Sequence, residues 1–279
     1  MAEIGQAKIT SLGCEIKRVR ALECLRPSSA AELLLARCDD GGLYVTRMAS
    51  DLNITLRVAK ELFANRLALL IGLPVREPAL IQIPGGLYRA GSNHDVLEPR
   101  QADKTNEIHL GSSYPGTGTE YLVTDFLPRN LLSCVANAQL AFLGSVVFDL
   151  WASNSRRRKY IFTKPVETPE ETYTAWLICN GHCFGWEAGD TDYSFTYSDS
   201  SIYKGARNMD SFEPTLSKVE RLDFTQIRDC LKGIPEEWLA QDSNLFLEIA
   251  ETLHDRCPTV RRDLHSIIMR NRRIFPSWG

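Results

Sequence analysis

Apolar and polar positions alternate in the first part of the chain and follow helical spacing in the rest. Two runs with an approximate period of two, at 32–38 and 43–48, flank the tetrapeptide Asp39-Asp40-Gly41-Gly42. An Asp-Gly pair favours a tight turn, because its glycine accepts a left-handed conformation. The two runs therefore predict a β-hairpin.

A helix is predicted next, over residues 52–71, because its apolar side chains recur at helical spacing. Gly72 stands where a helix C-terminus favours a left-handed residue, and Pro74 blocks continuation. The apolar run Pro78–Ile83 then predicts another strand. Residues 85–119 are polar and rich in Gly, Ser, Asn and Asp, so we expect long loops there.

The second half of the chain is predicted to be mostly helical. A short strand is expected at 121–126, before Pro128, and forms the crossing to this half. Three helical stripes follow: Leu140, Leu143, Val147 and Leu150 or Trp151; Leu245, Ile249 and Leu253; and Val260, Leu264 and Ile268. The pattern predicts an α+β protein with a β-rich part carrying one main helix, residues 1–124, and a helical part, residues 125–279.

Composition places the chain among ordinary globular proteins and against a globally basic nucleic-acid binder. Hydrophobic residues make up 44%, the formal net charge is −3 and the pI is near 6.0. We find neither a signal peptide nor an apolar run of about 18 residues, so no membrane partner is expected. The eight cysteines are scattered, without the paired spacing of a zinc site, and predict reduced thiols in the cytoplasm.

Nine short segments, in this order, resemble those of HipA-like kinases, in the standalone bacterial form that has only the kinase-like region. Each segment is weakly specific by itself, but the series covers nearly the whole chain. The segments are ARCDDGGLYVTRM, AKELFANRLALLIGLPV, LGSSYPG, DFLP, VFDLWASN, NGHCF, DSFEP, IPEEW and FPSW.

The resemblance implies a two-lobed protein-kinase-like fold that binds ATP and Mg²⁺ between its lobes. Such a site needs a cation on the nucleotide phosphates, a glutamate that holds this cation, and two carboxylates, one for the attacking hydroxyl and one for the metal. The glutamate is matched by Glu61, in AKEL. The position of the phosphate-holding lysine falls on Arg47, in YVTR.

Both carboxylate positions of the family are replaced. The catalytic aspartate, which follows an asparagine matched by Asn154, falls on Arg156, and an arginine cannot act as a base near neutral pH. The metal-holding aspartate falls on Cys179, or on Asn180 if the register shifts by one. A thiol or a neutral amide is a poor replacement for a carboxylate on Mg²⁺. The phosphate-covering segment at 26–30 contains no glycine.

These replacements predict a pseudokinase that acts as a nucleotide- or anion-binding module, or as a regulatory module for an unknown protein partner. One alternative is an active Ser/Thr-type kinase or phosphotransferase with relocated acids, such as Asp190 and Asp192. Another is a phosphate or nucleic-acid binder that uses the basic segment 156–159. Whether the chain is an enzyme stays open at this point.

The basic segment itself has two interpretations. Cations are favoured near the C-terminus of a helix and are solvated beyond it. Alternatively, Arg156 fills the catalytic position, where it pairs with Glu61 or Asp149 or binds an anion. Asp149 lies within an apolar helical stripe, so we interpret it as a buried hydrogen-bonding residue rather than a substitute base.

Overall fold

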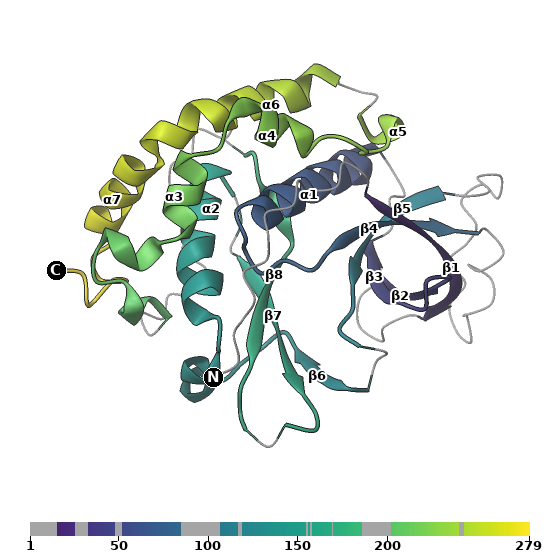
Figure 1. Ribbon diagram of the computed structural model, residues 1–279, viewed down its shortest axis with the longest axis horizontal. Helices are drawn as coiled ribbons and strands as arrows, with labels where there is room; N and C mark the ends of the chain where they lie inside the picture. Colours follow the sequence, from purple (N-terminus) through teal and green to yellow (C-terminus); the bar gives the residue numbers. More distant parts are fainter. Residues whose placement is uncertain are drawn as a thin grey trace.

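The computed structural model of the chain describes residues 16–25, 33–47, 52–84, 107–116, 119–154, 156, 158–168, 170–185, 202–239 and 243–279. Two sheets and a set of helices make up these residues (Figure 1). A closed barrel has the strand order β1-β2-β3-β5-β4, and a separate sheet has the order β6-β7-β8. This is a mixture of segregated strands and helices, as the α+β prediction requires.

The barrel contains the predicted hairpin. Its strands are β1 (Lys17–Leu25), β2 (Leu33–Cys38), β3 (Leu43–Arg47), β4 (Pro78–Ile83) and β5 (Glu107–Ser113). The hairpin prediction is confirmed, because β2 and β3 pair antiparallel across a turn in which Gly41 has a φ of +80°. The strand predicted at Pro78–Ile83 is confirmed as β4. Its parallel pairing with β1 closes the barrel.

The prediction of loops throughout 85–119 is wrong for β5. This strand lies between β3 and β4 and pairs antiparallel with both. Gly111 is one reason why this strand was not predicted. A Cβ atom at this position would lie 2.5 Å from Cγ1 of Ile81. The close approach of β4 requires a residue without a side chain, which weakens the apolar signal of the strand. Residues 85–106 lie outside the described part of the chain.

The predicted long helix is confirmed as α1 (Leu52–Leu70), which lies between the barrel and the other helices (Figure 1). It ends at Gly72, whose φ is +79°. Lys218 donates a hydrogen bond to the carbonyl of Ile71, 3.0 Å away. The helix is therefore stopped by its glycine and held there by a side chain from a distant part of the sequence.

The second sheet consists of β6 (Tyr121–Thr124), β7 (Lys159–Pro165) and β8 (Thr174–Ile178), all antiparallel. The predicted helix before β7 is a π-helical turn, Gln139–Leu143, followed by α2 (Gly144–Trp151). Three further helices follow β8, namely α3 (Thr215–Glu220), α4 (Phe224–Asp229) and α5 (Glu236–Leu239).

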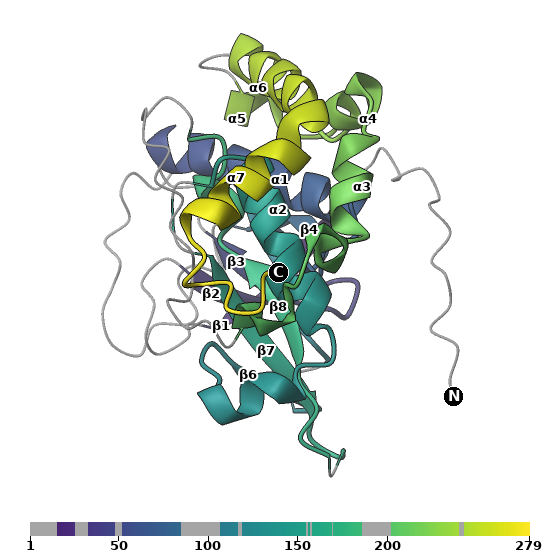
Figure 2. The same cartoon turned by 90° about the vertical axis from the view of Figure 1, so that its left-hand side faces the viewer.

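The two predicted closing helices are confirmed as α6 (Ser243–Arg256) and α7 (Val260–Arg270). They run one after the other along the outer edge of the molecule (Figures 1 and 2). A 3-10 turn that contains Pro258 joins them. Among the described residues, no helix has both the length and the apolar character needed to cross a membrane.

The structure has two separate hydrophobic cores. The larger one joins α1, α2, β7, β8 and the C-terminal helices, and the smaller one lies inside the barrel. His109 of β5 is also fully buried, and this burial lowers its pKa to about 4. A buried neutral histidine couples the stability of the fold to pH.

We expect the free energy of unfolding to fall as the pH drops from about 6.5 towards 4. In this window the unfolded chain binds a proton at His109 that the folded chain does not bind, so stability that is present above pH 6.5 is lost. The contribution reaches about 1 kcal/mol per pH unit. Urea unfolding at pH 7, 6 and 5 measures the slope of the unfolding free energy against pH. Comparison with a His109→Gln variant gives the part of this slope that comes from His109. Equal slopes in the two proteins would contradict this assignment.

Candidate functional site

The end of β3 and the middle of α1 form the first part of the site. Arg47 is the last residue of β3, and its Nε lies 3.2 Å from Oε2 of Glu61. Both side chains are mostly buried, with exposed fractions of 19% and 12%. Burial raises the pKa of Glu61, while the nearby guanidinium groups, Arg47 first, oppose this rise. The structure therefore brings together the two residues that the sequence placed in the phosphate-holding pair.

The turn after β8 packs directly against α1. Cys179 takes the left-handed conformation, with a φ of +61°, and Asn180–His182 form one 3-10 turn. A Cβ atom on Gly181 would lie 2.9 Å from Cγ and 3.0 Å from the carbonyl oxygen of Arg57. Contact this close to a helix backbone requires glycine. The turn thus holds Cys179 and Asn180 next to the Arg47–Glu61 pair.

Asn180 is completely buried and connects two parts of the molecule. Its amide nitrogen donates to Oδ1 of Asn65 on α1, and its Oδ1 accepts a hydrogen bond from Arg158. Because all of these polar atoms are shielded from water, each hydrogen bond removes a desolvation cost that the group would otherwise carry. The Asn180 amide is therefore fully engaged within the protein.

Arg158 lies at the centre of this buried network. Only 3% of the residue is exposed, and its guanidinium binds both carboxylate oxygens of Asp149, with Nε 3.1 Å from Oδ2. Asp149 also accepts a hydrogen bond from Asn154, at 3.0 Å. Burial disfavours the charged guanidinium, but the Asp149 carboxylate outweighs this effect and raises the pKa of Arg158. Arg158 therefore stays charged inside the protein.

Arg156 does not make the ion pair that one interpretation of the sequence expected of it. Its side chain is exposed, and its backbone N–H donates to Oδ1 of Asn154 at 3.2 Å. The expected pairing with Glu61 or Asp149 is wrong for this arginine. Arg158, two residues later, pairs with Asp149 because its place before β7 directs it into the core. The interpretation of Asp149 as a buried hydrogen-bonding residue agrees with its contacts.

Positive charge gathers around the turn after β8. Burial lowers the pKa of His182, and so do four neighbouring cations: Arg57, Arg156, Arg47 and Lys159. Burial raises the pKa of the Cys179 thiol, with Glu61 adding to this rise and the cations opposing it. We call Arg47, Arg57, Arg156 and Lys159 the cation cluster. Together with buried Arg158, they outnumber the two carboxylates of the site, Glu61 and Asp149.

The residues of the site do not fit Mg²⁺. This ion requires several oxygen ligands, preferably carboxylates. Glu61 and Asp149 are each paired with an arginine, Asn180 is hydrogen-bonded on both sides, and Cys179 offers a thiol. Over the described residues, no group of three or more His, Cys, Asp or Glu side chains forms a metal site. Asp190 and Asp192, and the segment at 26–30, lie outside the described residues.

Sequence reasoning missed three residues of the site: Arg57, Asn65 and Arg158. Asn65 interrupts an apolar stretch of α1 between Leu62 and Leu67, and a polar residue there signals a buried contact. Arg158 shares the alternation of Tyr160 and Phe162, both of which are buried on the core side of β7. The strand period of two therefore places Arg158 on the core side as well.

The arrangement of these elements is similar to that of solved kinases. No protein-family model matches the chain, and no curated protein matches it. The crystal structure of the Helicobacter pylori proinflammatory kinase CtkA aligns with a TM-score of 0.56, over 92% of this chain and 98% of that chain, at 14% identity. The chain has a kinase-like fold. A Golgi casein kinase structure aligns over 92% of this chain and 74% of its own, at 11% identity, but its TM-score of 0.47 is too low to add support.

Within this kinase-like fold, we expect the Asp149–Arg158 pair to control stability. An Arg158→Met variant leaves the buried carboxylate without its partner, which costs about 3–5 kcal/mol of unfolding free energy. Adding Asp149→Asn restores part of this loss, with a coupling energy of about 1–3 kcal/mol. Urea unfolding of the two single variants and the double variant measures the coupling.

Arg156→Met is the matched control, because it removes an exposed arginine from the same segment. This variant is expected to change the unfolding free energy by no more than about 0.5 kcal/mol. Equal losses in Arg156→Met and Arg158→Met would show that the buried pair has no special role.

Proposed function

We propose that the protein is a HipA-like pseudokinase, which binds nucleotide phosphate or a similar anion without Mg²⁺ and acts as a regulatory module. The kinase-like fold and the ordered series of HipA-like segments support the family assignment. Phosphoryl transfer needs a carboxylate that orients the attacking hydroxyl and a metal that neutralises developing charge. The side chains of the site do not fit a free carboxylate for the hydroxyl or a set of ligands for the metal.

The buried Arg158 network is the observation that carries this proposal. Asp149, on the helix that precedes the position of the catalytic aspartate, has both of its oxygens bound by Arg158. The same guanidinium binds Asn180, next to the position of the lost metal ligand. A carboxylate in a bidentate ion pair has little capacity left to accept a proton or bind a metal. The network therefore supports a function without catalysis.

The cation cluster supports anion binding in place of metal-assisted chemistry. Guanidinium groups bind phosphate oxygens through paired hydrogen bonds and remain charged at all physiological pH values. Arg47, Arg57, Arg156 and Lys159 lie close enough to His182 to lower its pKa together. A phosphate group placed among them gains the neutralisation that Mg²⁺ supplies in an active kinase.

We further propose that this module works in the bacterial cytoplasm and transmits its ligand state to a protein partner. Six of the cysteines in the described part of the chain are free thiols, which agrees with a reducing compartment. A module without catalysis affects its surroundings only by binding, so a protein partner is the simplest recipient of its signal.

The effect of Glu61→Gln on ATP affinity tests this proposal, because the two readings predict opposite signs. In a metal-free anion site, loss of the Glu61 charge removes repulsion and strengthens ATP binding about threefold to tenfold. In an active Mg²⁺-dependent kinase, the same change disturbs the cation that holds the phosphates and weakens binding. Calorimetric titration with ATP measures the affinity of the unchanged protein and of Glu61→Gln, once with EDTA and once with Mg²⁺. We expect each protein to have the same affinity under the two conditions.

Glu167→Gln is the control, since it removes an exposed carboxylate from the loop between β7 and β8. Its ATP affinity should equal that of the unchanged protein. Transfer of the γ-phosphate to the protein or to a test peptide should be undetectable. Mg²⁺-dependent transfer that Glu61→Gln abolishes would refute the pseudokinase assignment.

A further inference from the structure

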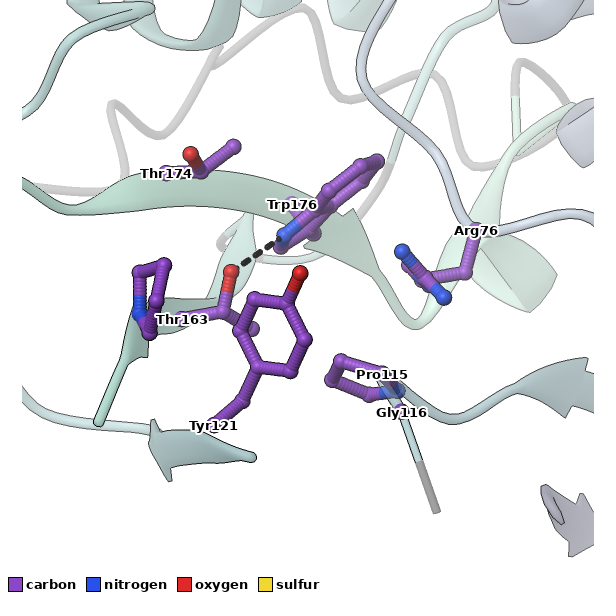
Figure 3. A pocket seen from close by; sticks show the side chains of 8 residues that line it. Arg76, Pro115, Gly116, Tyr121, Thr163, Thr174 and Trp176 are labelled. Atoms are coloured by element: carbon purple, nitrogen blue, oxygen red, sulfur yellow. Dashed lines mark hydrogen bonds between the residues drawn. The ribbon is translucent and has the colours of Figure 1, made fainter. Parts of the chain in front are cut away.

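A cavity of about 280 Å³ lies beside the C-terminal end of β7 and the first residues of β8, with Pro115 and Gly116, which follow β5, on another side (Figure 3). Thr163 and Pro165 of β7 and Thr174 and Trp176 of β8 form one side. Its volume is near the lower limit of about 300 Å³ for ligand pockets, so it suits a fragment-sized molecule. None of the residues proposed above to bind phosphate lines it.

The cavity is on the sheet face that turns away from the main core. Thr163 pairs with Thr174 in the β7–β8 register, and both alternate with side chains that are buried in the larger core. Lys159, a member of the cation cluster, lies on the same face at the other end of β7. Thr163 lies four positions further along β7, and four positions span about 13 Å of a strand. The cavity is therefore separate from the cation cluster.

Arg76 supplies the only charge in the described lining of the cavity. Its Nε donates to the carbonyl of Ser113 at 2.9 Å, and its guanidinium carbon lies 4.6 Å from the centre of the Trp176 ring. These two contacts fix the guanidinium. Within the described residues, its Nε makes the one hydrogen bond found for this side chain. Burial lowers the pKa of Arg76, and the nearby Glu77 opposes this.

The remaining polar groups of the cavity are hydroxyls. Trp176 donates its indole N–H to the Thr163 hydroxyl at 2.9 Å, which leaves the threonine hydrogen able to donate. The hydroxyls of Tyr121 and Thr174 have no hydrogen-bond partner among the described residues, and Figure 3 shows the Tyr121 hydroxyl directed towards Thr163 and Trp176. The described lining residues thus provide one fixed cation and the hydroxyls of Tyr121, Thr163 and Thr174, with no acid among them, which suits an acceptor with a negative charge.

The geometry favours a flat monoanion over a phosphate. A guanidinium presents its two terminal nitrogens in one plane, which matches the two oxygens of a carboxylate. One positive charge balances a carboxylate but leaves a dianionic phosphate undercompensated. Pro115 lies beside Tyr121 (Figure 3), and together they offer a flat apolar wall. Aromatic rings gain dispersion and offset stacking on such walls.

We propose that this cavity binds a small aromatic carboxylate, whose oxygens pair with Arg76 and whose ring lies against Tyr121 and Pro115. Binding here places a ligand against the connector between the barrel and the β6-β7-β8 sheet. It is independent of the anion site at the cation cluster.

Benzoate and benzamide are matched probes, since they share one shape and differ in charge. Calorimetric titration of the full-length protein should show benzoate binding about tenfold or more tighter than benzamide. Arg76→Gln should remove this difference, and Arg76→Lys should lose most of it, because an ammonium cannot form the paired contact. Tyr121→Ala, at a partly exposed position, should weaken both probes through loss of the wall.

Two further variants separate this site from its surroundings. Because Trp176 lines the cavity, benzoate should quench tryptophan fluorescence, and Trp176→Phe should abolish this quenching. Arg47→Ala, in the cation cluster, should leave benzoate affinity unchanged. If Arg76→Gln does not fold, the benzoate–benzamide ratio of the unchanged protein and the Tyr121→Ala result decide the question. Absence of benzoate binding, equal binding of the two probes, or no effect of Tyr121→Ala would overturn the proposal, whatever the outcome for ATP.

Discussion

The ion pair between Asp149 and Arg158 is the interaction on which the site depends. A charge that is buried without a partner costs several kcal/mol, so each member requires the other. The pair joins the end of α2 to the entry of β7, and the Arg158 contact with Asn180 adds the turn after β8. Asn65 extends the same network to α1. The network therefore connects α2, β7 and the turn after β8 to α1, the helix that also carries Glu61.

The parts of the fold that the sequence predicted are those with strong local signals. The β2–β3 hairpin has an Asp-Gly turn, and α1, α6 and α7 carry clear apolar stripes. β5 was missed because its neighbours determine it: His109 is buried and Gly111 approaches Ile81 only after β3 and β4 are in place. β7 and β8 were missed for a similar reason, since their backbone hydrogen bonds are made with neighbouring strands: β7 pairs with both β6 and β8.

The site was predictable where a motif carried it and not where tertiary packing decided it. Glu61 and Arg47 were found from short segments, and the structure brings them together. The run of arginines at 156–158 suggested a single residue at the catalytic position, whereas in the structure Arg158 is buried and Arg156 lies in solvent. The alternation of β7, extended back by one residue, separates buried Arg158 from exposed Lys159. It does not separate Arg158 from Arg156, which is exposed because it lies in the bend before the strand.

The buried arginine also affects what an acidic substitution in its neighbourhood could do. If aspartates were introduced at positions 156 and 179, Arg158 would still hold Asp149 and Asn180. An acid at position 180 would meet the same guanidinium and be neutralised by it. Replacing Arg158 first would leave Asp149 as a lone buried charge. A new acid would therefore meet a guanidinium that is already in place, so the packing of one side chain limits the charge that this part of the molecule can hold.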